Sequence, residues 1–119
     1  MFVQRDIDGI NVASAGEVLL RQFCQLNDDL AALSDGELVA LGKPVLPSDR
    51  DRAALVGAAF SYRYAETKLT PPAWLNDPGL IADELVCLVP SFQHLIEPET
   101  PAVVRRHNVL FDAASFESV

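Results

Sequence analysis

The chain has 119 residues, half of them hydrophobic, and a formal net charge of −8 at pH 7. This length is typical of one domain, and such a chain buries about two-thirds of its unfolded surface. Its high hydrophobic content argues against disorder. The negative charge repels nucleic acid, and no apolar run reaches the ~18 residues that a membrane span needs.

The first thirteen residues contain a turn signal. Asp8 and Gly9 lie between short apolar pairs. A dipeptide of this kind marks a turn or loop. We therefore predict that residues 1–13 form an N-terminal arm or a short strand.

A helix is predicted next. Ser14 and Glu17 have the spacing of a capping box, in which the Ser14 hydroxyl accepts the Glu17 amide. Large apolar residues then recur at steps of four and three: Leu19, Phe23, Leu26, Leu30 and Leu33. This spacing places them on one helical face. The face is long enough to support a homodimer, and burial in the core is the favoured interpretation.

A second capping box begins at Ser34 and closes at Glu37. It predicts a short helix that leaves the first at a bend, with a single continuous helix as the alternative. Gly42 is its natural left-handed stop, and Pro44 follows where a helix cannot continue.

A third helix is predicted to begin after Ser48, which can act as its N-cap. It should end before Pro71, because a residue ahead of proline avoids helical angles. Its apolar face consists of Leu55, Val56, Ala59, Phe60 and Tyr64.

The second half is less regular. Residues 70–79 hold three prolines and predict a rigid, irregular connection with Trp74 packed against the core. Residues 80–89 fit either a helix or a buried strand. Thr100 as N-cap and Pro101 at the first helical position predict another short helix, ending near residue 107.

The last residues complete the prediction. Asn108 can adopt the left-handed stop, Val109 to Phe111 should enter the core, and Asp112 can cap a final turn. The chain is thus predicted to be all-α, a single-domain bundle (residues 1–119) of about five short helices.

Few side chains stand out as candidate binding groups. They are Trp74, Arg105, Arg106, His107 and Asn108. Arginine suits an acidic or phosphate group on a partner, and tryptophan is frequent at interface hot spots. The alternatives are that the cations compensate the negative end of a helix and that Trp74 fills the core edge. We take these five as candidate partner-binding residues.

The sequence carries no signature of an enzyme. It lacks a Gly-x-Ser-x-Gly elbow, a phosphate-binding loop and a His-Glu-x-x-His metal motif. Cys24 and Cys87 do not form a Cys-x-x-Cys pair and are interpreted as small buried hydrophobes. We therefore expect no metal, no cofactor and no catalysis.

The second half resembles a large group of small uncharacterised bacterial proteins. The resemblance is carried by Pro72-Ala73-Trp74, Asn76-Asp77-Pro78, Thr100-Pro101-Ala102, Arg105-Arg106-His107-Asn108-Val109-Leu110-Phe111-Asp112-Ala113 and Phe116-Glu117-Ser118-Val119. It covers about residues 50–119. Family members often have a third basic residue in place of His107 and a Trp-Phe pair near residues 85–90, which this chain lacks. The resemblance implies an antitoxin-like partner in a bacterial toxin–antitoxin pair.

Three functions follow as hypotheses. The first is a protein–protein interaction module, the antitoxin or accessory component of a two-gene system, which neutralises a toxin encoded by an adjacent gene. The second is a ligand-binding or catalytic domain with a pocket near Trp74, Arg105, Arg106 and Asp112. The third, nucleic-acid binding through the two arginines, is disfavoured by the charge. The first residues lack a secretory signal, so we expect a cytoplasmic protein without membrane contact.

Overall fold

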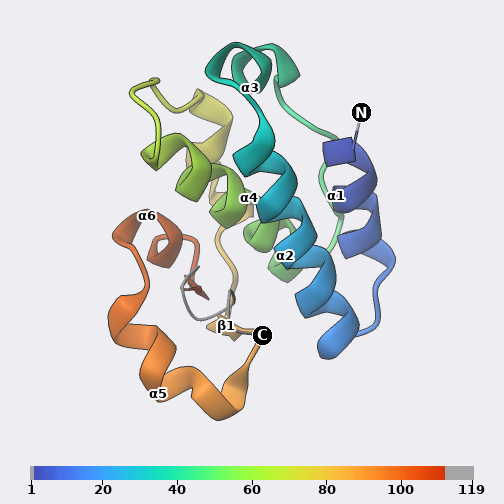
Figure 1. Ribbon diagram of the computed structural model, residues 1–119. Coiled ribbons are helices and arrows are strands. Elements are labelled where there is room, and N and C mark those ends of the chain that lie inside the picture. Colours follow the sequence, from blue (N-terminus) through green and yellow to red (C-terminus); the bar gives the residue numbers. More distant parts are fainter. Residues whose placement is uncertain (1, 112–119) are drawn as a thin grey trace.

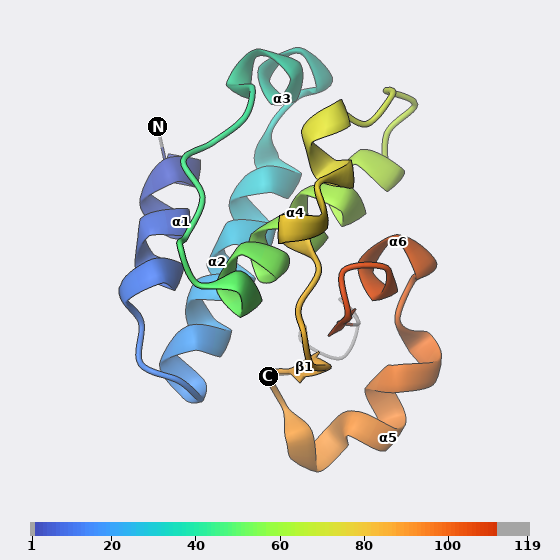
Figure 2. The same cartoon turned by 180° about the vertical axis from the view of Figure 1, so that it is seen from behind.

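Residues 2–111 are described by the computed structural model, in which α4 is the central helix. The first half forms α1 (Phe2–Val12), α2 (Glu17–Ala32), α3 (Asp35–Leu41) and α4 (Arg50–Ala65). Helices α1 and α2 run antiparallel side by side and pack against one side of α4, while α3 lies at one end of α2 (Figures 1 and 2). The chain after α4 packs mainly against its other side.

Helix α1 corrects the prediction of an arm or strand at residues 1–13. Val3, Ile7 and Ile10 recur at helical spacing and are buried against α2 and α4. Gly9 lies inside this helix and not in a turn, and a β-carbon there would meet the terminal amide group of the flexible Gln22 side chain on α2.

The apolar stripe of α2 is confirmed, although its predicted cap is wrong. Leu19, Phe23, Leu26 and Leu30 are buried. The helix begins after Gly16, which adopts a φ of 87° that glycine tolerates and provides no side-chain cap hydrogen bond, so Ser14 is not the N-cap. Leu33, which is extended at the C-cap, packs against the core only in part.

The start and stop of α3 are confirmed. Ser34 and Glu37 form the reciprocal capping box, and Gly42 has a φ of 66°. The extended conformation of Leu33 separates α2 from α3, so the predicted bend is confirmed as well. Helix α4 begins one residue later than predicted, because the Asp49 side chain, and not that of Ser48, accepts the Arg52 amide.

Two arginines of α4 hold α1 and α2 against it. The Arg52 guanidinium donates to the carbonyl of Ile10 in the last turn of α1 and to that of Ala13 just after the helix. Carbonyls at a helix C-terminus have no partner within the helix. Arg63 donates to Leu30 O and Leu33 O at the end of α2, both at 2.9 Å. Helix α4 is therefore joined by hydrogen bonds to each helix that it packs against in the first half.

The second half consists of short turns and helices. In order they are η1 (Ala73–Asn76), η2 (Pro78–Leu80), β1 (Val86–Cys87), η3 (Pro90–Phe92), α5 (Gln93–Ile96), η4 (Glu97–Glu99), α6 (Ala102–Arg105) and β2 (Val109–Leu110). Pro101, and not Thr100, is the N-cap of α6, because the Thr100 hydroxyl instead donates to Ile96 O and accepts from the Phe111 amide.

Residues 80–89, which fit either a helix or a buried strand in the sequence, contain β1. This strand pairs in parallel with β2, with Val86 opposite Val109 and Cys87 opposite Leu110. Val109, Leu110 and Phe111 are buried as predicted, and Phe111 packs edge-on against Phe23 of α2 at 5.0 Å. The predicted helical bundle is confirmed, with this two-residue ladder as an addition. Among residues 2–111 no helix has the length and apolarity of a membrane span.

Candidate functional site

The predicted site residues lie where α4, the η1–η2 turns and α6 meet. Trp74 is half-buried, and its ring packs edge-on against Phe60 of α4 with the ring centroids 5.2 Å apart. This contact matches the alternative in which Trp74 fills the edge of the core. Its exposed portion remains available to a partner.

His107 is 1% exposed, so its predicted place on an exposed surface is wrong. Its Nδ1 lies 2.7 Å from the carbonyl oxygen of Leu80, which can only accept a hydrogen bond. Nδ1 therefore carries the proton, and Nε2 accepts from the Ser61 hydroxyl at 2.8 Å. Burial lowers the pKa of His107, the Leu80 hydrogen bond opposes this shift, and the charge of Arg106 adds to it.

The position of His107 depends on a glycine in α4. A β-carbon at Gly57 would lie 3.1 Å from two atoms of the imidazole ring and 3.2 Å from Leu80. Arg106 extends the same network outward, because its guanidinium donates to Ser61 Oγ at 3.3 Å and to Asn76 Oδ1 at 3.2 Å. These contacts tie η1 and α6 to the middle of α4.

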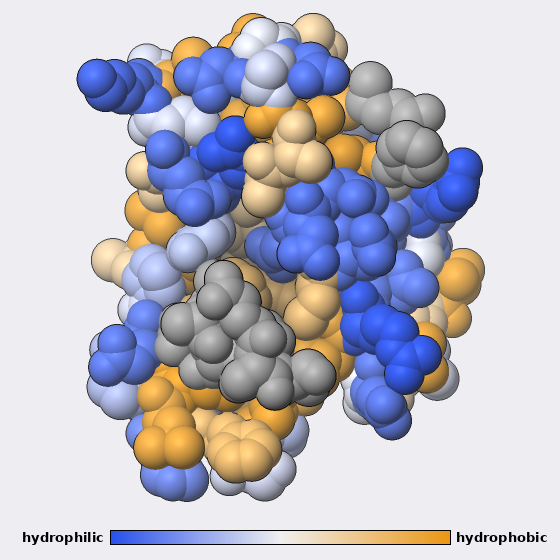
Figure 3. Space-filling view, in the orientation of Figure 1, coloured by the Kyte–Doolittle hydropathy of each residue, from blue (hydrophilic) through white to orange (hydrophobic). Residues whose placement is uncertain are grey.

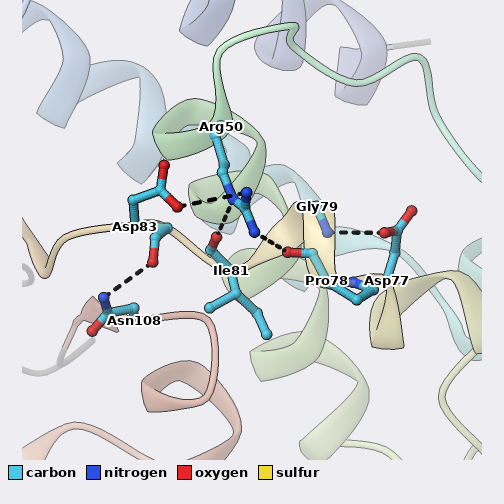
Figure 4. Close-up of polar contacts among 8 residues, drawn as sticks. Arg50, Asp77, Pro78, Gly79, Ile81, Asp83 and Asn108 are labelled. Carbon is cyan, nitrogen blue, oxygen red and sulfur yellow. Dashed lines mark hydrogen bonds and ion pairs between the residues drawn. The ribbon is translucent and has the colours of Figure 1, made fainter.

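Asn108 holds the next segment. It has a φ of 62°, the left-handed conformation that its position after the helix predicts. Its side chain donates to the carbonyl of Ala82 at 3.1 Å, and its own carbonyl accepts from the Val86 amide at 2.9 Å. Figure 4 shows Arg50 on the opposite side of this segment, donating to the carbonyls of Ile81 and Pro78.

The four consecutive polar residues therefore divide into two groups. Arg106, His107 and Asn108 are engaged within the protein. The Arg105 side chain is exposed and has no hydrogen-bond or ion-pair partner among residues 2–111. Of the four, Arg105 is the cation that is free to meet a partner.

The Ser61–His107 pair resembles a nucleophile and its base, but its surroundings differ from an active site. Ser61 is 4% exposed, and a backbone carbonyl stands where a carboxylate would orient the imidazole. A pocket beside His107 has a volume of about 120 Å³, below the roughly 300 Å³ at which ligand sites begin. It is lined by Leu75, Asn76, Asp77, Ile81, Arg106 and His107.

The predicted ligand pocket is only partly represented there. Of its four residues, Arg106 lines the pocket and Asp112 lies outside the described residues. Residues 2–111 contain no cluster of three or more His, Cys, Asp or Glu side chains that could hold a metal ion. Cys24 is half-buried, and burial raises the pKa of its thiol, which disfavours the reactive thiolate.

A carboxyl pair between α1 and α2 was missed by sequence reasoning. Asp6 is 6% exposed, and with Asp29 it lines an open pocket of about 580 Å³. Each aspartate lies on an apolar stripe, Asp6 beside Val3 and Ile7, and Asp29 beside Leu26 and Leu30. A carboxylate within such a stripe is the signal that could have identified them.

A second missed feature is an exposed apolar surface on residues 81–99, which we call the acidic arm. Leu85, Phe92 and Leu95 are 40%, 54% and 56% exposed. Phe92 and Leu95 are one helical turn apart at η3 and α5. Figure 3 shows hydrophobic surface at the lower edge of the molecule, over the α5 region, with hydrophilic side chains beside it.

The acidic arm also has a one-sided charge. Its carboxylates are Asp83, Glu84, Glu97 and Glu99, and the sequence contains no lysine or arginine between Lys68 and Arg105. Asp83 approaches Arg50 at 3.5 Å, in a pair that is open to solvent. No protein-family model, curated protein or solved structure matches the chain.

Proposed function

We propose that this protein is a protein–protein interaction module that binds a basic partner through the acidic arm. The main support is that this segment exposes three large apolar side chains, Leu85, Phe92 and Leu95. Carboxylates flank them, and the segment contains no lysine or arginine. Apolar side chains rimmed by polar groups are typical of protein interfaces, and single-sign charge selects a partner of opposite charge.

The use of the arginines elsewhere supports the same assignment. Arg50, Arg52 and Arg63 donate to backbone carbonyls, so much of the cationic surface is directed inward. Of the 15 acidic residues at positions 2–111, two take part in ion pairs among the described residues, Arg21–Glu17 and Arg50–Asp83. Most carboxylates therefore remain available to attract a basic surface.

The class of partner rests on the resemblance of residues 50–119 to antitoxin-like proteins. We propose that the partner is a toxin encoded by an adjacent gene and that the complex neutralises it by covering its active surface. In this mechanism the protein contributes contact area and charge, and no bond is made or broken.

The test measures how strongly two variants, each changed at one exposed aliphatic residue, bind the product of the adjacent gene. Leu95→Lys removes an apolar contact and adds a positive charge to the acidic arm, so we expect the dissociation constant to rise at least ~10-fold, as for loss of an interface anchor. Val39→Lys is the matched control, because Val39 on α3 is 58% exposed and Leu95 is 56% exposed. Titration calorimetry measures both. Equal affinities for the two variants, or no complex with the wild type, would contradict the proposal.

A further inference from the structure

The interface between α1 and α2 contains a buried polar atom without a donor. Asp6 Oδ2 is buried and has no hydrogen-bond partner among the described residues. Asp6 is 6% exposed, and its side chain lies within hydrogen-bonding reach of Asp29 on α2. Two carboxylates have only acceptors, so a hydrogen bond between them requires that one of them carries a proton.

The charged groups around Asp6 favour that proton. From α1, Arg5 lowers the pKa of Asp6, whereas Asp29 on α2 raises it. From α4, Arg52 is directed to the carbonyls at the end of α1, beyond Asp6 along the helix. Burial is the largest effect, and together these raise the pKa of Asp6 from 3.8 to about 7.

The remaining polar groups of the pocket do not replace the proton. Gln22 and Gln25 on α2 line it together with Arg5 and Gly9. The Gln25 amide donates to Asp29 at 3.1 Å and so leaves Asp6 without that donor. Asp6 of α1 and Asp29 of α2 line this one pocket together.

We propose that Asp6 and Asp29 share one proton that fastens α1 to α2, so that the docking of α1 weakens as the pH rises toward neutrality. The protonated Asp6 carboxyl group donates to the Asp29 carboxylate. When the proton leaves to solvent, two negative charges remain side by side in a partly buried pocket and repel each other. The weakened interface exposes the apolar face of α1, formed by Val3, Ile7 and Ile10.

The test measures the proton and the helix separately in the full-length protein. NMR of the side-chain carboxyl carbons should give Asp6 a midpoint near 7. Amide exchange should show that the protection of α1, relative to that of α4, falls about 30-fold between pH 5.5 and 8, because a group with a pKa near 7 in the docked state and of 3.8 in the undocked state loses a factor of about ten per pH unit up to pH 7 and little above it.

Three variants assign the effect to the pair. Asp6→Asn and Asp29→Asn each supply an amide donor and should make the protection of α1 independent of pH in this range. Asp28→Asn is the control, because Asp28 is the exposed neighbour of Asp29 and should leave the wild-type response intact. If Asp6→Asn fails to fold, Asp29→Asn and the wild-type titration still decide the question. An Asp6 midpoint near 4, or equal wild-type protection of α1 at both pH values, would overturn the proposal.

Discussion

At the scale of single residues, adjacent side chains of one motif have different roles. His107 is buried with both ring nitrogens engaged, whereas Arg105, two residues earlier, is exposed. A buried polar group whose partner is removed costs more than the hydrogen bond contributes, because the partner stays desolvated. The motif therefore combines a structural anchor with a surface cation.

Alanine substitutions separate these roles. His107→Ala leaves the Ser61 O–H without its acceptor and the Leu80 carbonyl without its donor beside a cavity, so the free energy of unfolding should fall by about 2–4 kcal/mol. Arg105→Ala removes no side-chain hydrogen bond or ion pair among the described residues and should change the free energy of unfolding by less than about 0.5 kcal/mol. Urea unfolding at pH 7 measures both. Equal losses for the two variants would refute this division.

The titration of His107 predicts a dependence of stability on acid. Because burial lowers its pKa below 6.5, the unfolded chain binds more protons as the pH falls through 6.5, and stability decreases there. Asp6 has the opposite sign, because its raised pKa makes stability fall as the pH rises from about 4 to about 7. In an Asp6→Asn background, urea unfolding between pH 7.5 and 5.5 should show a loss that His107→Gln abolishes. An unchanged slope in the double variant would assign the loss to another group.

At the scale of elements, α4 organises the molecule through small residues and arginines. Ala53 to Ser61 are all buried, because helices pack on one side and the η1–η2 turns and α6 on the other. Small side chains at this centre let neighbours approach closely. Arg50, Arg52 and Arg63 then satisfy carbonyls of the segments that they contact.

Alanine substitutions at Gly57 in α4 and at Gly36 in α3 test whether neighbours pack closely against α4. Gly57→Ala gains helix propensity of about 1 kcal/mol but crowds the fixed His107 ring, so we expect a net loss of about 1 kcal/mol. Gly36→Ala in α3 has nothing within 4 Å and should gain about 0.5 kcal/mol. Thermal unfolding compares them. A stabilising Gly57→Ala would mean that His107 is not held against α4.

The elements also show where sequence reasoning succeeds. The stripe of α2, the Ser34 capping box and the Asn108 stop depend on neighbours within a turn or two, and the sequence predicts them. Helix α1 was missed because Gly9 was interpreted as part of a turn, whereas its contact with Gln22 involves another helix.

The features that the sequence did not predict depend on contacts between residues far apart in the chain. The β1–β2 ladder joins Val86 to Val109, a pairing that local pattern cannot specify. The candidate site was predicted only in part for the same reason. Residue type identifies Arg106 and His107 as unusual, but the partners Ser61 and Leu80 come from distant segments and determine which side chain is buried.

At the scale of the whole molecule, charge and apolar surface are unevenly distributed. The net charge is −8, and the segment between Lys68 and Arg105 has no lysine or arginine. The same segment exposes Leu85, Phe92 and Leu95. An acidic surface with apolar contacts suits a basic protein partner, and the charge would accelerate encounter at low salt.

Hydrogen–deuterium exchange of the protein, alone and with the product of the adjacent gene, tests this account most directly. We predict that peptides from residues 81–99 become protected in the complex, while peptides of α3 (Asp35–Leu41) exchange at unchanged rates. Protection confined to α3 or to another surface, or no protection of residues 81–99 at concentrations where the complex forms, would contradict it.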